Sequence, residues 1–520
     1  MKCPRPPCGR FHLPQLSESD QEDTFTGEEY TSVAACRSGT RRLLCGNGGS
    51  GRSCRGSPQS GDGPRNPASG VRAASRLPPR LPGHFPRHHH RSLRRPVPST
   101  PLRRAPGPAP PRLPPPRRRL APAGRCHRDP DVAPRPGLRP LLSAAEPTVL
   151  VVDIFGTDVF DVAHELRLPK YIFFTSTALL LSLMMWLPAL DEEVHGEYVD
   201  LESPIRVPGC KPIPVVDLMD PLLDRSDERY RWFLYQASRF PLADGILINT
   251  SQVLEPVTLK ALSEDPHLKR IPTPAVYPVG PVTESDVGPL SCRESPSPIL
   301  KWLDGQPPGS VIYVSFGSGG TLSAEQVTEL AWGLELSQQR FVWVVRAPTG
   351  SEGPGSYFTA GGGAGEPSEY LPDGFLSRTR GRGLVVPSWA PQREILRHGA
   401  VGAFLSHCGW NSALESIVRG VAIIAWPLYA EQKSNASTLA EELGVAVKVV
   451  RRPGGECVGR EEVERVVRLM MEGEEGKAMK TRMKELGKKV LSGLDEGGSS
   501  FRSLQEVINI WKTDSTTESR

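Results

Sequence analysis

Residues 401–427 read VGAFLSHCGWNSALESIVRGVAIIAWP, and this stretch decides the fold. It opens with an apolar run that ends near Ser406, and it closes with a second apolar run, VAIIAWP. Between the two runs, the spacing of apolar residues predicts a helix that starts at Asn411 or Ser412. Strands that alternate with helices in this way indicate a parallel, doubly wound sheet.

The same alternation extends in both directions along the chain. Further strands are expected at VLVVD (149–153), YIFF (171–174), GILINT (245–250), SVIYVSFGS (310–318), RFVWVVR (340–346), GLVVPSW (383–389) and VAVKVV (445–450). Helices are expected after the first two of these strands, over 227–239 and 323–336, and from Gln392 and Glu431. AVYPVGPV (275–282) and the Ser/Pro-rich run 285–298 are interpreted as a linker, and the Gly-rich run 349–366 as a surface loop. Ligands of such sheets bind at the carboxyl ends of the strands.

Residues 51–147 differ in composition from the rest of the chain. They contain 20 arginines, no lysine, four acidic residues and 23 prolines, and Phe85 is their single phenylalanine. With almost no large apolar side chains to bury, this segment is predicted to be disordered. Its positive charge exceeds the whole-chain net charge of +5, so residues 148–520 are net acidic. The segment could attract nucleic acid by charge alone, but it lacks a binding module, and nucleic acid is not expected as a partner.

Cysteine usage and hydropathy bear on the compartment. The ten cysteines show no paired CxxC spacing, and the four beyond residue 148 are scattered singly, which favours free thiols in a reducing compartment. Residues 1–25 contain no apolar core of the length that a signal peptide needs. The run 171–190 is about long enough to span a bilayer, but its hydroxyl residues and Pro188 favour a buried strand, turn and helix. We expect a cytoplasmic protein without stable membrane insertion.

The turn inside the opening stretch carries residues suited to an anion. Backbone N–H groups at a helix N-terminus, with the positive end of the helix dipole, attract phosphate. His407, Asn411 and Ser412 would add side-chain donors to the same oxygens. An alternative interpretation needs no ligand, because Ser412 and Glu415 have the S-x-x-E spacing of a capping box. The spacing alone favours neither interpretation.

Four further side chains would complete a nucleotide-sugar site. Trp389 could stack on a base, although a tryptophan at a strand end is more often part of a core. Glu415 could accept hydrogen bonds from two vicinal ribose hydroxyls. Glu431 and Gln432, after the strand VAIIAWP, offer an acceptor and an amide suited to sugar hydroxyls. Each residue taken singly also has an ordinary surface role, but together they indicate nucleotide-sugar binding.

The segment from Trp389 to Gln432 resembles the signature box of the plant family-1 UDP-glycosyltransferases. The runs at 151–174, 208–225 (PGCKPIPVVDLMDPLLDR), 313–346 and 424–436 (IAWPLYAEQKSNA) are similar to its hydroquinone and other phenol glucosyltransferases, and the resemblance covers roughly residues 148–512. It implies an α/β fold with two Rossmann-like domains, the GT-B glycosyltransferase architecture, with the N-terminal domain incomplete. The expected parts are an aberrant Arg/Pro-rich segment (1–147), the remaining acceptor domain (148–284), a linker (285–298), a UDP-sugar-binding domain (299–495), and a C-terminal helix and tail (496–520).

The resemblance also assigns roles within the donor site. Trp389 would stack on the uracil with Ala390 beside it, Gln392 would lie at the nucleoside, and Glu415 would hold the ribose. The diphosphate would be held by Ser318, His407, Asn411 and Ser412. The glucose would be held by the backbone of Trp410 and by Glu431 and Gln432, with Thr175 as a further sugar contact. Gln432 favours glucose over galactose in the family, and UDP-glucose would be a co-substrate with no metal or other cofactor.

Catalysis in this family uses a histidine near the N-terminus that an aspartate holds in the right tautomer. Asp153 matches the aspartate, but no histidine matches its partner, which follows a first strand in a Gly-x-Gly-His turn. His12 follows no strand, His84 and residues 88–90 lie among arginines and prolines, and His127 lies in GRCHRDP. The chain is therefore expected to lack its general base.

Two explanations of residues 51–147 remain open. Residue types with AT-rich codons are depleted there, and types with GC-rich codons are enriched. That bias is expected when a GC-rich gene is read out of frame, which favours a frameshifted or mis-joined N-terminal region. The alternative is a genuine Arg/Pro-rich extension on a truncated relative.

These observations leave two functional hypotheses. The first is an inverting, UDP-glucose-dependent O-glucosyltransferase of small phenolic acceptors such as hydroquinone, impaired in this chain. The second is a non-catalytic UDP-sugar-binding protein. In either case we expect a monomer whose terminal helix, about 503–511, crosses back onto the first domain.

Overall fold

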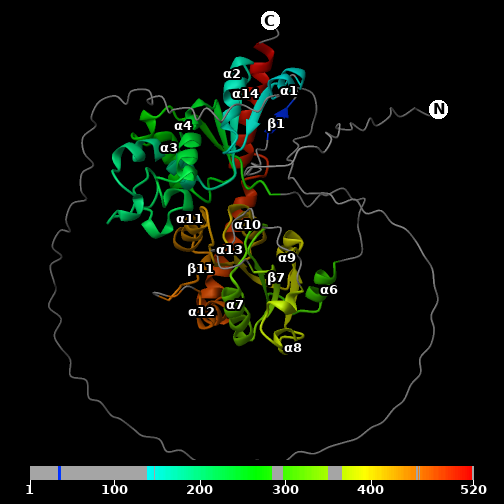
Figure 1. The fold of residues 1–520 in the computed structure, drawn as a ribbon. Coiled ribbons are helices and arrows are strands. Elements are labelled where there is room, and N and C mark those ends of the chain that lie inside the picture. The colour runs from blue at the N-terminus through cyan, green and yellow to red at the C-terminus, as the bar shows by residue number, and fades with distance from the viewer. Residues whose placement is uncertain are drawn as a thin grey trace, which may run out of the picture. The chain divides into compact units, whose positions relative to one another are not determined.

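The computed structural model describes residues 138–145, 147–283, 297–348, 366–452, 455 and 457–517, together with the backbone of residues 33–36. Side chains are described as far as Thr513. All of these residues belong to one unit of the chain, and Figure 1 shows their helices and strands. The Gly-rich run 349–365 and most of the segment 1–147 lie outside the described residues.

The first sheet has five strands in the order β1-β2-β3-β4-β5. The strands are β1 Val33–Cys36, β2 Val149–Val152, β3 Lys170–Phe174, β4 Gly245–Ile248 and β5 Ala275–Pro278. Pairs from β2 to β5 are parallel, whereas β1 is antiparallel to β2. Interpreting residues 275–282 as linker was wrong for residues 275–278, because these pair with β4 over its full length and form the edge strand.

Helices alternate with the strands of this sheet along the chain. They are α1 Leu138–Ala145, α2 Phe160–Glu165, α3 Ala178–Glu193, α4 Glu228–Arg239 and α5 Pro256–Glu264. Helix α1 lies inside the segment 51–147 that was expected to be disordered, and its Leu142 is buried in the same cluster as Leu150 of β2. The residues of the apolar run 171–190 form β3 and α3, the strand, turn and helix that we expected. In the described residues, no helix is long and apolar enough to cross a membrane.

The second sheet has six parallel strands in the order β11-β10-β9-β6-β7-β8. The strands are β6 Val311–Ser315, β7 Arg340–Val345, β8 Gly383–Pro387, β9 Val401–Ser406, β10 Ile423–Ala425 and β11 Ala446–Lys448. The helices are α6 Pro298–Asp304, α7 Ala324–Ser337, α8 Phe375–Arg378, α9 Gln392–Arg397, α10 Trp410–Arg419, α11 Gln432–Ser437, α12 Arg460–Glu472, α13 Glu474–Ser492 and α14 Ser499–Thr517. The expected α/β fold with two Rossmann-like sheets is thus confirmed.

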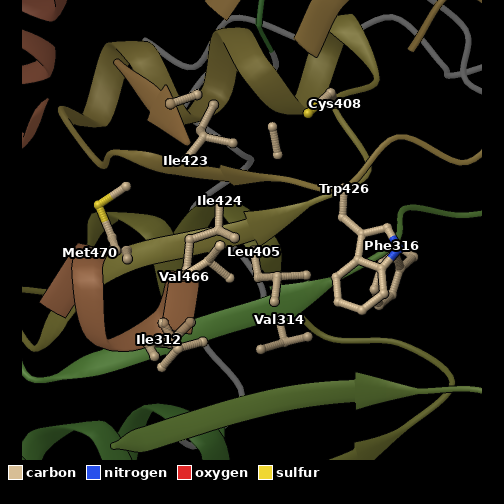
Figure 2. Packing of buried hydrophobic residues seen from close by; sticks show 14 of the residues in the cluster. Ile312, Val314, Phe316, Leu405, Cys408, Ile423, Ile424, Trp426, Val466 and Met470 are labelled. Atoms are coloured by element: carbon tan, nitrogen blue, oxygen red, sulfur yellow. The ribbon is translucent and has the colours of Figure 1, made fainter. Parts of the chain in front are cut away.

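Strands β6, β9 and β10 are central, and their residues are buried on both faces, as parallel sheets covered by helices require. Figure 2 shows Ile312, Leu405 and Ile424 from these strands beside Val466 and Met470 of α12. Each of these five side chains is fully buried. This dense core fixes the strands against each other and so fixes where each strand ends.

An aromatic pair closes the core beneath those strand ends. Phe316 directly follows β6 and Trp426 directly follows β10 (Figure 2). Their ring centroids lie 5.8 Å apart with the ring planes at 89°, an edge-to-face contact that favours a defined geometry. The loops beyond the two strands therefore start from a rigid base.

The terminal helix α14 packs on the first sheet. Its Leu504, Val507 and Trp511 belong to one cluster with Val149 of β2 and Tyr171 of β3. The Tyr171 and Trp511 rings meet edge to face at 5.2 Å. The helix is longer than the expected residues 503–511, and it is red in Figure 1.

Candidate functional site

Several of the residues expected to bind a ligand lie in the loops at the carboxyl ends of the strands of the second sheet. Ser406 of β9 lies opposite both Ser315 of β6 and Ala425 of β10, and each of these is the last residue of its strand. Val345 of β7 likewise lies opposite Pro387 of β8. The loops that leave these five neighbouring strand ends carry Ser318, Arg346, Trp389, His407 and Glu431.

His407 directly follows β9 and is only 8% exposed. Burial, with a smaller contribution from the positive charge of Arg346, lowers the pKa of His407 from 6.5 to about 4. Its imidazole is therefore neutral at pH 7. Nδ1 is buried and has no hydrogen-bond partner among the described residues.

Two glycines make room for this ring. A Cβ atom on Gly317 or on Gly409 would lie 2.6 or 2.5 Å from His407 Nε2, closer than any real contact. Gly317 also has φ of +77°, which a side chain would strain. The sequence SFGSGG is thus a tight turn over the histidine as well as the loop that carries Ser318.

Helix α10 begins at Trp410, with Gly409 as its N-cap and no side chain capping its first turn. The capping-box interpretation of Ser412 and Glu415 was wrong, because Ser412 is the third residue inside the helix and not its cap. The first N–H groups of an α-helix have no partner within the helix. This N-terminus, beside a buried neutral histidine, has the donors and the dipole direction that an anion requires.

Gln392 brings the predicted ribose and phosphate residues together. Its Nε2 donates to Glu415 Oε2 at 2.8 Å and to Ser412 Oγ at 3.1 Å. Gln392 begins α9, and the other two residues lie on neighbouring turns of α10. Asn411, on the same helix, is exposed.

Trp389 is 70% exposed and does not belong to a core, unlike most tryptophans at strand ends. It follows Ser388, which has φ of +63°, and its backbone N–H donates to the carbonyl oxygen of Pro387 at 2.7 Å. The neighbouring Ala390 is buried at 5% exposure and anchors this turn. The indole is therefore a large aromatic surface on an anchored turn, which suits stacking.

The loop after β10 presents Glu431 and Gln432. Gln432 is buried, and its Oε1 accepts from the amides of Leu428 and Tyr429 at 2.9 and 3.2 Å. Only its Nε2 is therefore left for a ligand, and the side chain also shapes its own loop. Burial raises the pKa of the Glu431 carboxyl, and Glu431 Oε1 accepts from Asn435 Nδ2 at 3.4 Å.

The expected sugar contact at Trp410 is compatible with its backbone alone. The indole is 2% exposed, and its Nε1 donates to the carbonyl of Asn249 at 2.7 Å. Asn249 directly follows β4 of the first sheet. This hydrogen bond joins the start of α10 to a strand end of the other sheet.

Asp153 and Thr175 directly follow β2 and β3 of the first sheet, where Val152, the last residue of β2, lies opposite Ile172 of β3. Asp153 is half-buried, and its Oδ1 accepts from the Phe155 amide at 3.0 Å. Thr175 is half-buried in the turn before α3. The histidines weighed as partners of Asp153, from His12 to His127, lie outside the described residues.

Sequence reasoning missed two residues of this region. Asn435, fully buried, donates from Nδ2 to Cys408 O at 3.0 Å and so holds the turn beside His407. Arg346 directly follows β7 and could have been found, because the strand-end rule that selected the other residues applies equally to it. Among the described residues, no group of three or more metal-ligating side chains is arranged to hold a metal ion.

Comparisons with known proteins identify the family of the chain. A family model described as "UDP-glucoronosyl and UDP-glucosyl transferase" matches residues 268–480. The chain is 48% identical to hydroquinone glucosyltransferase of Rauvolfia serpentina, over 73% of this chain and 78% of that protein. It is also 48% identical to anthocyanidin 3-O-glucosyltransferase 5 of Manihot esculenta, over 74% of this chain and 78% of that protein.

The chain is also similar to solved structures. The structure of TcCGT1 in complex with UDP matches with a TM-score of 0.69 and 47% identity, over 72% of this chain and 80% of that one. Phytolacca americana UGT2 complexed with UDP-2fluoro-glucose and pterostilbene matches with a TM-score of 0.64 and 44% identity, over 72% and 79%.

Proposed function

The chain belongs to the plant family-1 UDP-glycosyltransferases, and from this premise we propose that it binds UDP-glucose at the strand ends of its second sheet. One observation carries the proposal. A buried, neutral His407 lies beside the N-terminus of α10, whose first turn no side chain caps. A tautomer with its proton on Nε2 would donate to a phosphate oxygen, and a neutral imidazole needs no carboxylate partner.

The other predicted residues fit the remaining parts of the donor. The exposed Trp389 indole would stack on the uracil, and Glu415, oriented by Gln392, would accept from the ribose hydroxyls. Ser318, Asn411 and Ser412 would add diphosphate donors. Glu431, the free amide of Gln432 and the Trp410 backbone would hold the glucose, with Thr175 as a further contact. These donors would stabilise the leaving diphosphate electrostatically, so no metal is invoked.

We further propose that the acceptor is a small phenol such as hydroquinone. The relative from Rauvolfia serpentina bears that activity in its name, and Phytolacca americana UGT2 was solved with pterostilbene. Asp153 would orient a histidine base, and transfer would invert the anomeric centre. Because no histidine of the sequence matches that base, we propose that this chain transfers little or no glucose. A non-catalytic UDP-sugar-binding protein is the second candidate, and the same missing histidine favours it.

Calorimetry on the 520-residue chain tests the donor proposal. UDP-glucose should bind, and ADP-glucose, which has the same sugar and diphosphate but a purine base, should bind much more weakly. His407→Gln should weaken UDP-glucose binding without changing the fold by circular dichroism. Equal affinity for the two sugar nucleotides, or no binding of either, would contradict the proposal.

A further inference from the structure

Arg346 lies between the two loops that carry the base and diphosphate residues of the proposed site. It directly follows β7, which lies between β6 and β8 in the sheet. Its Nε donates to the carbonyl oxygen of Ser388 at 3.2 Å, and its Nη1 donates to the carbonyl oxygen of Ser318. One planar guanidinium therefore joins the loop after β6 to the loop after β8.

Both carbonyls belong to turns with unusual backbone geometry. Ser388 has φ of +63° and directly precedes the exposed Trp389. Ser318 directly follows Gly317, whose φ of +77° lets the backbone pack on the His407 ring. A non-glycine residue in the left-handed region, such as Ser388, persists only where neighbouring groups hold it. The rigid fork of an arginine suits this task, because its donors have a fixed relative geometry.

The charge of Arg346 is not balanced by a carboxylate in the described part of the chain. Two other arginines of this domain do pair with carboxylates, since Arg378 pairs with Glu335 at 2.7 Å and Arg460 pairs with Glu329. Arg346 is half-buried, and its positive charge helps to lower the pKa of His407. A cation that already acts on His407 also acts on an anion bound beside that histidine.

We propose that Arg346 is a positioning residue of the donor site, which holds the Ser318 and Trp389 loops in place and supplies positive charge to the diphosphate. The proposal rests on the UDP-sugar site proposed above. It assigns Arg346 a role in donor affinity and in the preference for UDP over uridine. A residue that only stabilised the fold would leave that preference unchanged.

Calorimetric titration of the full chain with UDP and with uridine tests the proposal. Arg346→Gln removes both the fork and the charge, and should weaken UDP binding about 10- to 100-fold, the loss typical of hydrogen bonds to charged groups. Uridine binding should fall by a clearly smaller factor. Arg340→Gln is the matched control, because Arg340 is a half-buried arginine at the other end of β7. It should leave both affinities unchanged.

Arg346→Lys separates the two contributions and serves if the glutamine variant does not fold. It keeps the charge but loses the fork, so both ligands should bind more weakly while the preference for UDP over uridine is largely kept. The proposal is overturned if Arg346→Gln binds UDP as the Arg340 control does, or if UDP and uridine lose affinity equally. Failure of the unaltered chain to bind UDP would instead refute the proposed function.

Discussion

The two sheets differ in what their strand ends offer. In the second sheet, five neighbouring parallel strands each end beside a residue suited to a nucleotide sugar, and the hydrogen bonds of Gln392 join α9 to α10. In the first sheet, Asp153 and Thr175 follow β2 and β3, and β2 pairs on its other side with an antiparallel strand, β1. On the proposed function, donor binding and catalysis would depend on different parts of this chain, and one could be complete without the other.

Replacing residues 1–147 with the N-terminal segment of a close relative should have the largest effect. That segment would restore a parallel first strand beside β2 and a histidine beside Asp153. General-base catalysis contributes about 100- to 10,000-fold, so glucose transfer to hydroquinone should rise by a factor in that range. Transfer of labelled glucose is the measurement.

The same graft with alanine in place of the restored histidine is its control. It should bind UDP-glucose as the active graft does but remain inactive. If the alanine graft transfers glucose equally well, Asp153 and its proposed partner have no catalytic role, and the contrast between the sheets has another cause.

Trp389→Ala should weaken binding of the donor at the second sheet. Stacking of a base on an aromatic ring is worth about 1–3 kcal/mol, so UDP and uridine should both bind about 10- to 100-fold more weakly. Trp389→Phe should recover most of the loss. Unchanged uridine affinity in the alanine variant would exclude Trp389 as the base platform.

Stability should depend on pH through His407. Burial holds its folded-state pKa at about 4, below the unfolded value of 6.5, so the unfolded chain takes up the proton first as the pH falls. The free energy of unfolding is therefore unaffected by protonation of His407 above pH 6.5. It falls as the pH is lowered toward 4, by about 2 kcal/mol at pH 5. Urea unfolding at pH 7 and pH 5 should show this loss in the unaltered chain.

The variant His407→Gln isolates that effect, because it lacks the imidazole but keeps every carboxyl group of the chain. The difference in unfolding free energy between the unaltered chain and the variant should shrink on going from pH 7 to pH 5. A difference independent of pH would show that the histidine is not held neutral.

The smallest effect is expected from the glycine turn over His407. Gly317→Ala introduces both a strained φ and a clash with the imidazole, whereas Gly309→Ala, at φ of +65°, meets no atom within 4 Å. The first should therefore be less stable than the second by about 1 kcal/mol or more, as measured by thermal unfolding. Gly317→Ala should also weaken UDP binding, and equal stability of the two variants would argue against the close packing of Gly317 on His407.

The sequence predicted this fold well where burial decides the structure. The runs 401–406 and 421–427 are apolar enough to be buried strands of a parallel sheet. They contain β9 and β10, and helix α10 lies between them. Sequence failed where pairing in space decides. AVYPVGPV was interpreted as linker because it contains prolines, which are rare inside strands. Residues 275–278 nevertheless form an edge strand, because they pair with β4.

The candidate site divides in the same way. The sequence shows which residue types follow the predicted strands. Trp389, His407 and Glu431 could therefore be selected as candidate ligand-binding residues. Local spacing could not distinguish a capping box from a helix that begins two residues earlier, at Trp410. Nor could it show that Gln392 bridges Ser412 and Glu415, since that contact depends on how α9 lies against α10.

The most direct test measures donor binding and glucose transfer on one preparation of the 520-residue chain. UDP-glucose is titrated by calorimetry, and hydroquinone is then added at a saturating concentration of labelled UDP-glucose. We predict saturable UDP-glucose binding with little or no labelled glucoside. Rapid formation of the glucoside, or the absence of UDP-glucose binding, would contradict the proposal that this chain has a complete donor site without its catalytic partner.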